Sequence, residues 1–432
     1  MSDILQAVVL IGSLLLLLGL GVWIGFALIA CAIIGLVFFA DTPAGLIFAA
    51  KSWESSTSWA LTALPLFIWM GEILYRTRLA QDMFEGLGPW VRSFPGGLVH
   101  INVFACGIFA AVSGSSSATT ATIGRISLPE LKKRGYDDSI SIGSLAGAGT
   151  LGLLIPPSIV MIVYGVAAEV SIIRLFVGGV LPGLLLMLLF SGYIGFWSLL
   201  HPARIAPKEP QIPLRERIYK LRLLLPVVFL ILMVVGSIYG GFATATEAAT
   251  LGVLGALLIA KVSGYLTKDA LVQSLLGATR TTCMIAFILT GAAFLTSAMS
   301  FTGLPANLAN WIIFMDLSPY AFIAFLTLLF IVLGAFLDGI SIVLLTTSIL
   351  MPAVKTVGID PLWFGIYLII VVEMAQITPP IGFNLFIIQG VTDKNIFELI
   401  KMSFPFLLLM ILMTAFVTIF PEIVTYLPET MR

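Results

Sequence analysis

A hydroxyl-rich segment inside an otherwise apolar region is the first candidate for chemistry. Residues 113–124 read SGSSSATTATIG, and hydroxyl and main-chain carbonyl oxygens of this kind can replace the water shell of a small cation such as sodium. Because glycine permits a sharp reversal of the chain, we expect a re-entrant hairpin that enters over 98–113, turns at 113–117 and returns over 117–130. The alternative is close packing between membrane helices, where Ser, Thr and Gly are also enriched.

A single acidic residue occupies the matching place in the second half of the chain. Asp338 stands in the segment LDGIS at 337–341, in the middle of an apolar stretch. An ionisable residue is costly at such a position and by default indicates a function there. The other interpretation is that Asp338 caps a half-helix that starts at Gly339, and the two roles are compatible. We expect a second hairpin here, entering from the opposite, periplasmic face.

Each expected hairpin is followed by a double proline, Pro156-Pro157 in the first half and Pro379-Pro380 in the second. Proline lacks the N–H group and clashes with the preceding turn, so two in a row break a membrane helix. The break frees carbonyl groups that can face cations and N–H groups that can face an anion. Ser158 and Thr378 add hydroxyl groups at these breaks. The sequence therefore predicts two broken helices.

The double prolines belong to an internal repeat with an offset of 223 residues. The loop at 129–137 and its counterpart at 352–360 share the positions of Pro, Gly and Asp, but the first carries Lys-Lys-Arg at 132–134 and the second only Lys355. Since basic loops collect on the cytoplasmic side, equivalent loops of different basic content predict an inverted repeat. The alternative is a parallel duplication whose loop charges have drifted.

The composition agrees with a chain embedded in a lipid bilayer. Of 432 residues, 59% are hydrophobic and 10% are charged, with a net charge of zero, whereas soluble domains carry about 25% charged residues. A soluble protein, a disordered chain and a nucleic-acid binder are excluded on this basis. Neither a phosphate-binding loop nor a nucleophile elbow occurs in the sequence. We therefore expect no enzyme activity, and expect the driving force to come from an ion gradient or another subunit.

These patterns predict an all-α polytopic membrane protein with two re-entrant hairpins and two broken helices in inverted repeats. The expected divisions are N-terminal scaffold helices at 1–60, repeat 1 at 61–200, a basic cytoplasmic linker at 201–222, central scaffold helices at 223–280 and repeat 2 at 281–432.

The chain resembles the large membrane subunit (DctM type) of tripartite ATP-independent periplasmic (TRAP) transporters. Two departures from that family's usual pattern are visible: Ala245 stands where proline is common, and Val371 and Ala375 stand where Asn and Gly are common. The resemblance covers nearly the whole chain, in the stretches LPLFIWMGE at 64–72, VSGSSSATTATIG at 112–124, LPELKKRGYD at 128–137, LGLLIPPSIVMIVYG at 151–165, LFVGGVLPGLLL at 175–186, TATEAA at 244–249 and ITPPIGFNLF at 377–386.

The resemblance implies a sodium-coupled importer of organic acid anions with an elevator-type mechanism and two sodium sites. We expect the first sodium among Ser113, Ser115, Ser116, Gly147, Gly149 and Pro157. We expect the second among Asp338, Gly339, Ser341, Ala375, Gln376 and Thr378. For the anionic substrate between the hairpin tips, the expected residues are Ser116, Ser117, Ser158, Ser341, Thr378, Pro380 and Asn384.

The resemblance also implies partners. We expect a periplasmic substrate-binding protein and a small four-helix membrane subunit, the latter as a separate chain, in a bacterial or archaeal cytoplasmic membrane. The competing hypothesis is a stand-alone ion-coupled anion carrier or exporter of the same inverted plan. Transport without any periplasmic protein would favour that alternative.

Overall fold

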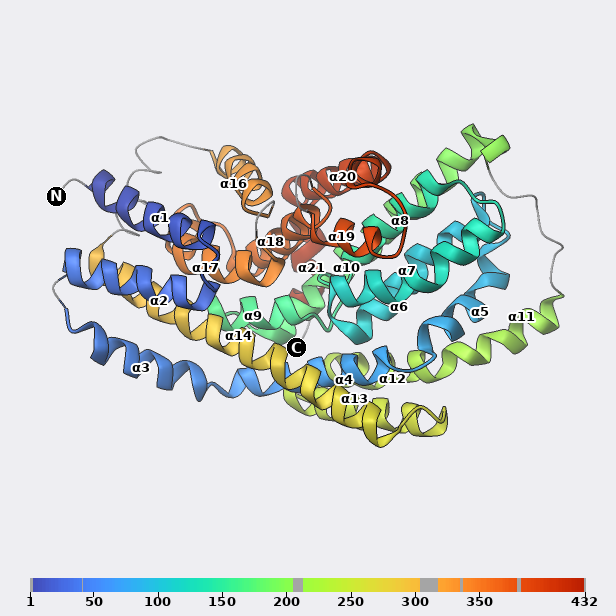
Figure 1. Ribbon diagram of the computed structural model, residues 1–432, viewed down its shortest axis with the longest axis horizontal. Helices are drawn as coiled ribbons and strands as arrows, with labels where there is room; N and C mark the ends of the chain where they lie inside the picture. Colours follow the sequence, from blue (N-terminus) through green and yellow to red (C-terminus); the bar gives the residue numbers. More distant parts are fainter. Residues whose placement is uncertain are drawn as a thin grey trace.

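The computed structural model describes residues 3–40, 42–204, 213–303, 318–334, 337–378 and 382–430, and this part of the chain is helical without any strand (Figure 1). By length and apolar composition, five of the described helices could cross a membrane, or seven spans if two bent helix pairs each count as one. Several others are apolar but shorter, as expected for hairpin arms and half-helices. The five are Ile172–Leu200, Leu214–Tyr239, Ala245–Val262, Lys268–Thr302 and Ile396–Ile419.

One group of helices packs around a single long helix, α14. Helices α2, α3 and α4 all lie against α14, and the α12–α13 pair adjoins α4. In Figure 1, α3, α4, α12 and α13 form one long side of the molecule. The bounds are α1 (Asp3–Gly19), α2 (Ile24–Gly35), α3 (Ala44–Ser56), α4 (Ala63–Tyr75), α5 (Leu79–Val91), α11 (Leu214–Leu221), α12 (Leu225–Tyr239), α13 (Ala245–Val262) and α14 (Lys268–Thr302).

Local sequence signals explain where these helices start. The Thr244 hydroxyl accepts from the Glu247 N–H while the Glu247 carboxylate accepts from the Thr244 N–H, a capping box that begins α13. Thr267 caps α14 by accepting from the Ala270 N–H at 3.1 Å. Helix α14 then runs without interruption across the expected domain boundary at 280/281. The division of the chain into domains stays a prediction.

The remaining helices form two similar sets. The first set is α6 (His100–Ser113), α7 (Ser116–Lys133), α8 (Asp138–Thr150), α9 (Ile159–Ala167) and α10 (Ile172–Leu200). The second is α16 (Pro319–Gly334), α17 (Gly339–Thr356), α18 (Pro361–Ala375), α19 (Phe383–Gln389) and α20 (Ile396–Ile419), followed by α21 (Glu422–Thr430). Helix α8 from Ile140 and helix α18 from Leu362 are buried on every side, so the two broken helices form the centre of the molecule.

Two contacts show that the broken helices run antiparallel. Near the end of α9, the Tyr164 hydroxyl donates to the carbonyl of Pro361 at the start of α18, across 2.6 Å. After the end of α19, the Lys394 ammonium lies 3.0 Å from the carboxylate of Asp138 at the start of α8. The hydrogen bond to Asp138 and its charge raise the pKa of Lys394. The end of each broken helix thus meets the start of the other, which confirms the inverted repeat.

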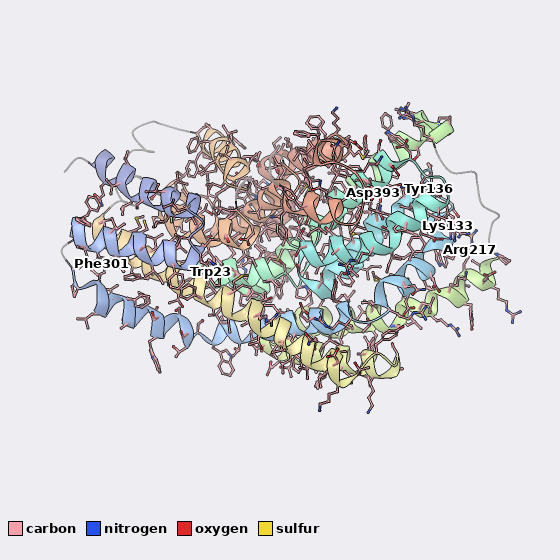
Figure 2. All side chains as sticks on the ribbon, in the orientation of Figure 1. Trp23, Lys133, Tyr136, Arg217, Phe301 and Asp393 are labelled. Atoms are coloured by element: carbon pink, nitrogen blue, oxygen red, sulfur yellow. The ribbon has the colours of Figure 1, made fainter. Side chains whose placement is uncertain are left out.

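The basic segments of the chain collect at one end of the molecule. Figure 2 shows Lys133, Tyr136 and Arg217 together at that end, with Phe301 at the opposite end. Lys133 ends the return arm of the first hairpin, and Arg217 belongs to α11 in the linker region. Two segments that the sequence assigns to one side of the membrane therefore share one end of the fold.

Candidate functional site

The tip of the first hairpin is a tight turn between α6 and α7. Gly114 adopts a left-handed conformation with a φ of 60°, which glycine reaches at little cost. Ser115 then caps α7 by accepting from the Ala118 N–H at 3.4 Å. The Thr119 hydroxyl turns back to the tip, 2.9 Å from the Ser113 hydroxyl and 2.7 Å from the Ser115 carbonyl. The hydroxyl groups of this segment therefore form a connected cluster at the tip.

The main chain around the first break packs directly against the main chain of this tip. The N–H of Ile159, just after the double proline, donates to the Gly114 carbonyl at 3.3 Å. A Cβ atom on Gly152 would lie 2.5 Å from the carbonyl group of Ser115, so only glycine fits there. Ser158 is fully buried and caps α9 through the Met161 N–H. Hairpin and break thus form one packed unit.

The second hairpin places Asp338 at the start of α17. Its carboxylate accepts from the N–H groups of Ile340 at 3.2 Å and Ser341 at 3.4 Å, and from the Ser341 hydroxyl. The capping role is therefore confirmed, and ion binding by Asp338 stays a prediction. A Cβ atom on Gly339 would lie near side chains of Val372, Leu153 and Gln376. This hairpin consequently touches both breaks.

The second break is described on both of its sides. Before it, the Thr378 hydroxyl donates to the Met374 carbonyl at 2.7 Å. After it, the Asn384 N–H donates to the Gln376 carbonyl at 3.1 Å, and the Asn384 side-chain amide donates to the Ser116 hydroxyl at 2.6 Å. Pro379 and Pro380, and with them the predicted contact of Pro380 with substrate, lie outside the described residues.

A cavity of about 720 Å³ lies where these parts meet. It is walled by both hairpin tips, by Leu153 and Gln376 next to the two breaks, and by α4 and α14 of the other helix group. Seven of the residues that the sequence nominated line it, namely Ser113, Ser115, Ser116, Ser117, Asp338, Gly339 and Gln376.

The other nominated residues that the structure describes lie behind this wall. Gly149 packs against the Thr120 hydroxyl, and the carbonyl of Gly147 accepts from the Thr150 hydroxyl at 2.8 Å. The Pro157 carbonyl lies 2.8 Å from where a Cβ atom of Gly114 would be. Ser158, Ser341, Ala375, Thr378 and Asn384 also lie outside the cavity lining.

Sequence reasoning missed several polar groups of the site. The sequence analysis includes Thr119 and Thr120 only as members of a hydroxyl-rich segment. Thr119 lies one helical turn after the cap residue Ser115, so its side chain faces Ser115. Glu72 lines the cavity from α4, and Glu373 is fully buried in α18. Neither glutamate is among the residues that the sequence analysis assigns to a site.

The donor chemistry of the site fits a small hard cation. The Thr120 hydroxyl and the Asn384 side-chain carbonyl are buried without a hydrogen-bond partner among the described residues, and buried oxygens of this kind usually have one. The carbonyls of Gln376 and Thr378 each lie 3.1 Å from the Cβ position of Gly382. Neutral oxygens therefore gather behind the tip of the first hairpin and around the second break.

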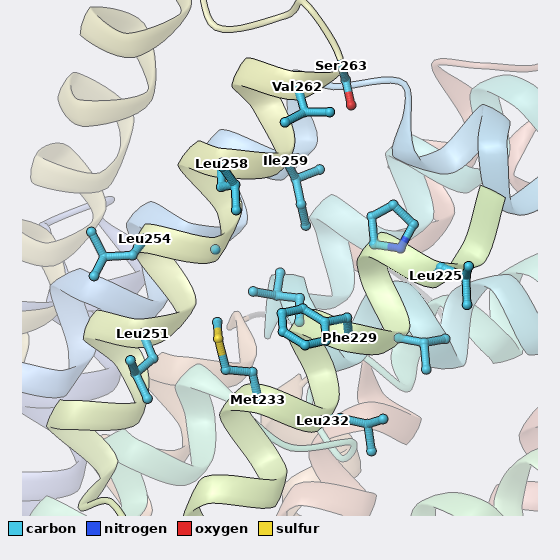
Figure 3. Close-up of a pocket in the computed structure, with 14 residues that line it drawn as sticks. Leu225, Phe229, Leu232, Met233, Leu251, Leu254, Leu258, Ile259, Val262 and Ser263 are labelled. Atoms are coloured by element: carbon cyan, nitrogen blue, oxygen red, sulfur yellow. The ribbon is translucent and has the colours of Figure 1, made fainter. Parts of the chain in front are cut away.

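A second cavity, about 740 Å³ in volume, has a different character. It opens between α12 and α13, and Figure 3 shows that its lining side chains are apolar apart from Ser263. Leu225, Phe229 and Leu254 on its wall are each at least 60% exposed. Such a surface suits lipid chains rather than an organic anion.

Inverted repeats with two hairpins and two broken helices around a cavity define the architecture of a secondary transporter. Residues 11–423 match the family described as "Tripartite ATP-independent periplasmic transporter, DctM component". The chain belongs to this family.

Characterised relatives and one solved structure extend this comparison. The chain is 33% identical to the C4-dicarboxylate TRAP transporter large permease protein of Pseudomonas aeruginosa, over 91% of each chain. It is 29% identical to the sialic acid TRAP transporter large permease protein of Vibrio cholerae, over 97% and 98% of the two chains. The crystal structure of the YdaH transporter of Alcanivorax borkumensis aligns with a TM-score of 0.61 at 14% identity, over 93% of this chain and 98% of that one, which shows a shared fold.

Proposed function

We propose that the chain is the large transmembrane subunit of a sodium-coupled importer of organic acid anions, such as dicarboxylates or sugar acids. Family membership and the names of the relatives support the substrate class. The substrate would occupy the cavity between the two hairpin tips, and sodium ions would bind beside each tip.

The main support for this proposal is that the N-termini of several helices line the cavity. Helices α7, α9 and α17 and the short helix α19 each contribute their first residue to its wall: Ser116, Ile159, Gly339 and Phe383. The start of a helix presents N–H groups without an intrahelical partner and a partial positive charge. Cap side chains already accept from some of these groups at α7, α9 and α17. No Lys or Arg lines the cavity among the described residues, so helix dipoles and hydroxyl groups would hold the carboxylate.

Sodium coupling is supported by the neutral oxygens at the tips and breaks. We assign one sodium to the hydroxyl cluster of the first hairpin and the other to the region between Asp338 and Thr378. Because hairpins and breaks share these sites, a bound cation would order the walls of the substrate cavity. This order gives a physical reason for cation and anion to be transported together.

An elevator motion is supported by the contact between α4 and the first hairpin. A Cβ atom on Gly71 would lie 3.1 Å from the Ser113 carbonyl, so the main chains of the two elements approach closely, without side chains between them. We propose that the hairpins and broken helices move as a body past α4 and α14. A small four-helix membrane subunit and a periplasmic binding protein would complete the transporter in the cytoplasmic membrane.

Uptake into proteoliposomes tests the proposal. The assay contains the chain, the small subunit and the loaded binding protein, with and without a sodium gradient. We expect uptake only with sodium, and expect a strong loss in a variant with both Ser115→Ala and Thr378→Ala. Uptake without sodium would contradict the coupling, and uptake without the binding protein would favour a stand-alone carrier.

The chain offers a matched control for that variant. Ser171 caps α10 through the Arg174 N–H at 3.4 Å, as Ser115 caps α7. Thr418 donates to the carbonyl four residues earlier at 2.7 Å, as Thr378 does. A variant with Ser171→Ala and Thr418→Ala loses the same two local bonds away from the cavity. It should retain its sodium dependence.

A further inference from the structure

The groove between α12 and α13 is walled by two stripes of apolar side chains. The members of each stripe recur every three or four positions, so they share one face of their helix, and each is between 37% and 80% exposed. The two helices approach closely at the floor, where a Cβ atom on Gly255 would lie 2.5 Å from the Leu230 side chain. The stripes are Leu225, Val228, Phe229 and Leu232 on α12 and Leu251, Leu254, Leu258 and Val262 on α13 (Figure 3).

A basic residue continues each stripe at the same end of the groove. Arg222, in the short 3₁₀ turn that leads into α12, lies three positions before Leu225, and Lys261 in the last turn of α13 lies three positions after Leu258. The hydroxyl group of Ser263 lines the groove at this end (Figure 3). Between Arg222 and Lys261 the sequence contains a single charged residue, Glu247, at the far end of the helix pair. Only one mouth of the groove is therefore basic.

Both cations remain available to an external anion. Neither Arg222 nor Lys261 forms an ion pair with another described residue. The Arg222 guanidinium stacks on the ring of Tyr219, 3.6 Å from its centroid, and such stacking occupies the face of the guanidinium but leaves the N–H groups at its edge able to donate. The nearby carboxylate of Glu216 is paired with Lys220 at 3.4 Å.

The groove suits a lipid better than a helix of another protein. Helices in membranes associate through small residues that let their main chains approach. Within α12 and α13, which are described in full, Gly255 is the one small residue of the groove wall, and the side chains of Leu230 and Met233 already cover it. Flexible acyl chains follow a wall of Leu, Val and Phe without such close approach, and basic pockets between membrane helices on the cytoplasmic side bind anionic headgroups.

We propose that the groove between α12 and α13 binds an anionic phospholipid of the cytoplasmic leaflet. Its acyl chains lie between the two apolar stripes, and its phosphate is held by Arg222 and Lys261, with the Ser263 hydroxyl as a further donor. Helix α13 packs on α4, where a Cβ atom on Gly252 would lie 2.5 Å from the Met70 sulfur, so the lipid braces the helices past which the hairpins move. The inference does not depend on sodium coupling or on the identity of the transported anion.

Native mass spectrometry of the full chain in a neutral detergent tests this site. Phosphatidylglycerol and phosphatidylcholine with the same acyl chains are titrated separately, and we expect preferential binding of phosphatidylglycerol. A variant with Arg222→Gln and Lys261→Gln should bind it about tenfold more weakly. The matched control carries Lys132→Gln and Lys133→Gln, which remove the same charge at the same end of the molecule, away from the groove, and it should bind as the wild type does. Equal binding of the two lipids, or an equal loss in the control, would overturn the proposal.

A second variant keeps the test independent of the first. Ser263 is exposed, so Ser263→Asp places a negative charge at the basic mouth without disturbing the core, and it should weaken binding of phosphatidylglycerol about fivefold. Ser263→Asn, of similar size and uncharged, should not. Unchanged binding in Ser263→Asp would overturn the assignment of the phosphate to this mouth. Addition of the small membrane subunit to the lipid-loaded chain should leave the lipid bound, whereas release of the lipid would show that this face is a protein interface and overturn the proposal.

Discussion

The side-chain amide of Asn384 donates a hydrogen bond to the hydroxyl of Ser116 across 2.6 Å, between residues 268 positions apart. Both side chains are buried. Ser116 begins the return arm of the first hairpin, and Asn384 is the second residue of the half-helix after the second break. One bond therefore joins the hairpin of one repeat to the broken helix of the other.

Removal of either partner should destabilise this junction. Asn384→Ala leaves the Ser116 hydroxyl unpaired and Ser116→Ala leaves the amide unpaired, each at about 1–3 kcal/mol. The double variant should cost less than the sum, with a coupling energy of about 0.5–3 kcal/mol. Thermal unfolding of the four proteins measures this cycle. Strict additivity would show that the two groups do not interact.

Gly152 should tolerate no larger residue. A Cβ atom there would lie 2.5 Å from the main chain of Ser115, and main chain cannot be displaced as cheaply as a flexible side chain. We expect Gly152→Ala to cost about 1–3 kcal/mol and to reduce transport severely. Gly192→Ala in α10 is the matched control, because no atom lies within 4 Å of its Cβ position. Comparable transport by both variants would refute the close contact.

Replacement of Asp338 by asparagine separates its two roles. Asparagine caps helices as well as aspartate does, so Asp338→Asn should unfold at the temperature of the wild type. We expect its half-saturating sodium concentration to rise about fivefold, as for a loss of roughly 1 kcal/mol of charge attraction. Asp338→Ala, which also loses the cap, should be less stable by about 0.5–2 kcal/mol. A normal sodium response in Asp338→Asn would assign Asp338 to capping alone.

The inverted repeat predicts that Lys133 and Lys355 lie on opposite membrane faces. Single cysteines at these positions should react with an impermeant thiol reagent from opposite sides. The background requires Cys283→Ser, since Cys283 is exposed whereas Cys31 and Cys106 are buried. Labelling of both positions from the same side would contradict the topology.

The local features of the fold were predictable because their causes are local. A double proline breaks a helix wherever it stands, and a Ser-Gly-Ser tip both reverses the chain and caps the next helix. The uninterrupted α14 was not predicted, since its first turns from Lys268 to Arg280 are too polar to be recognised by hydropathy. The contact between Asn384 and Ser116 could not be predicted either, because only the packing of the two repeats brings these residues together.

Gly71 meets the first hairpin at the Ser113 carbonyl, through main-chain atoms. Every residue type has the same main chain, so substitutions among the hydroxyl side chains of the tip leave this fit to α4 intact. The side chains of the tip can therefore diverge during evolution while the contact between the hairpin and α4 stays the same. A single scaffold could in this way serve homologues with chemically unrelated nutrients.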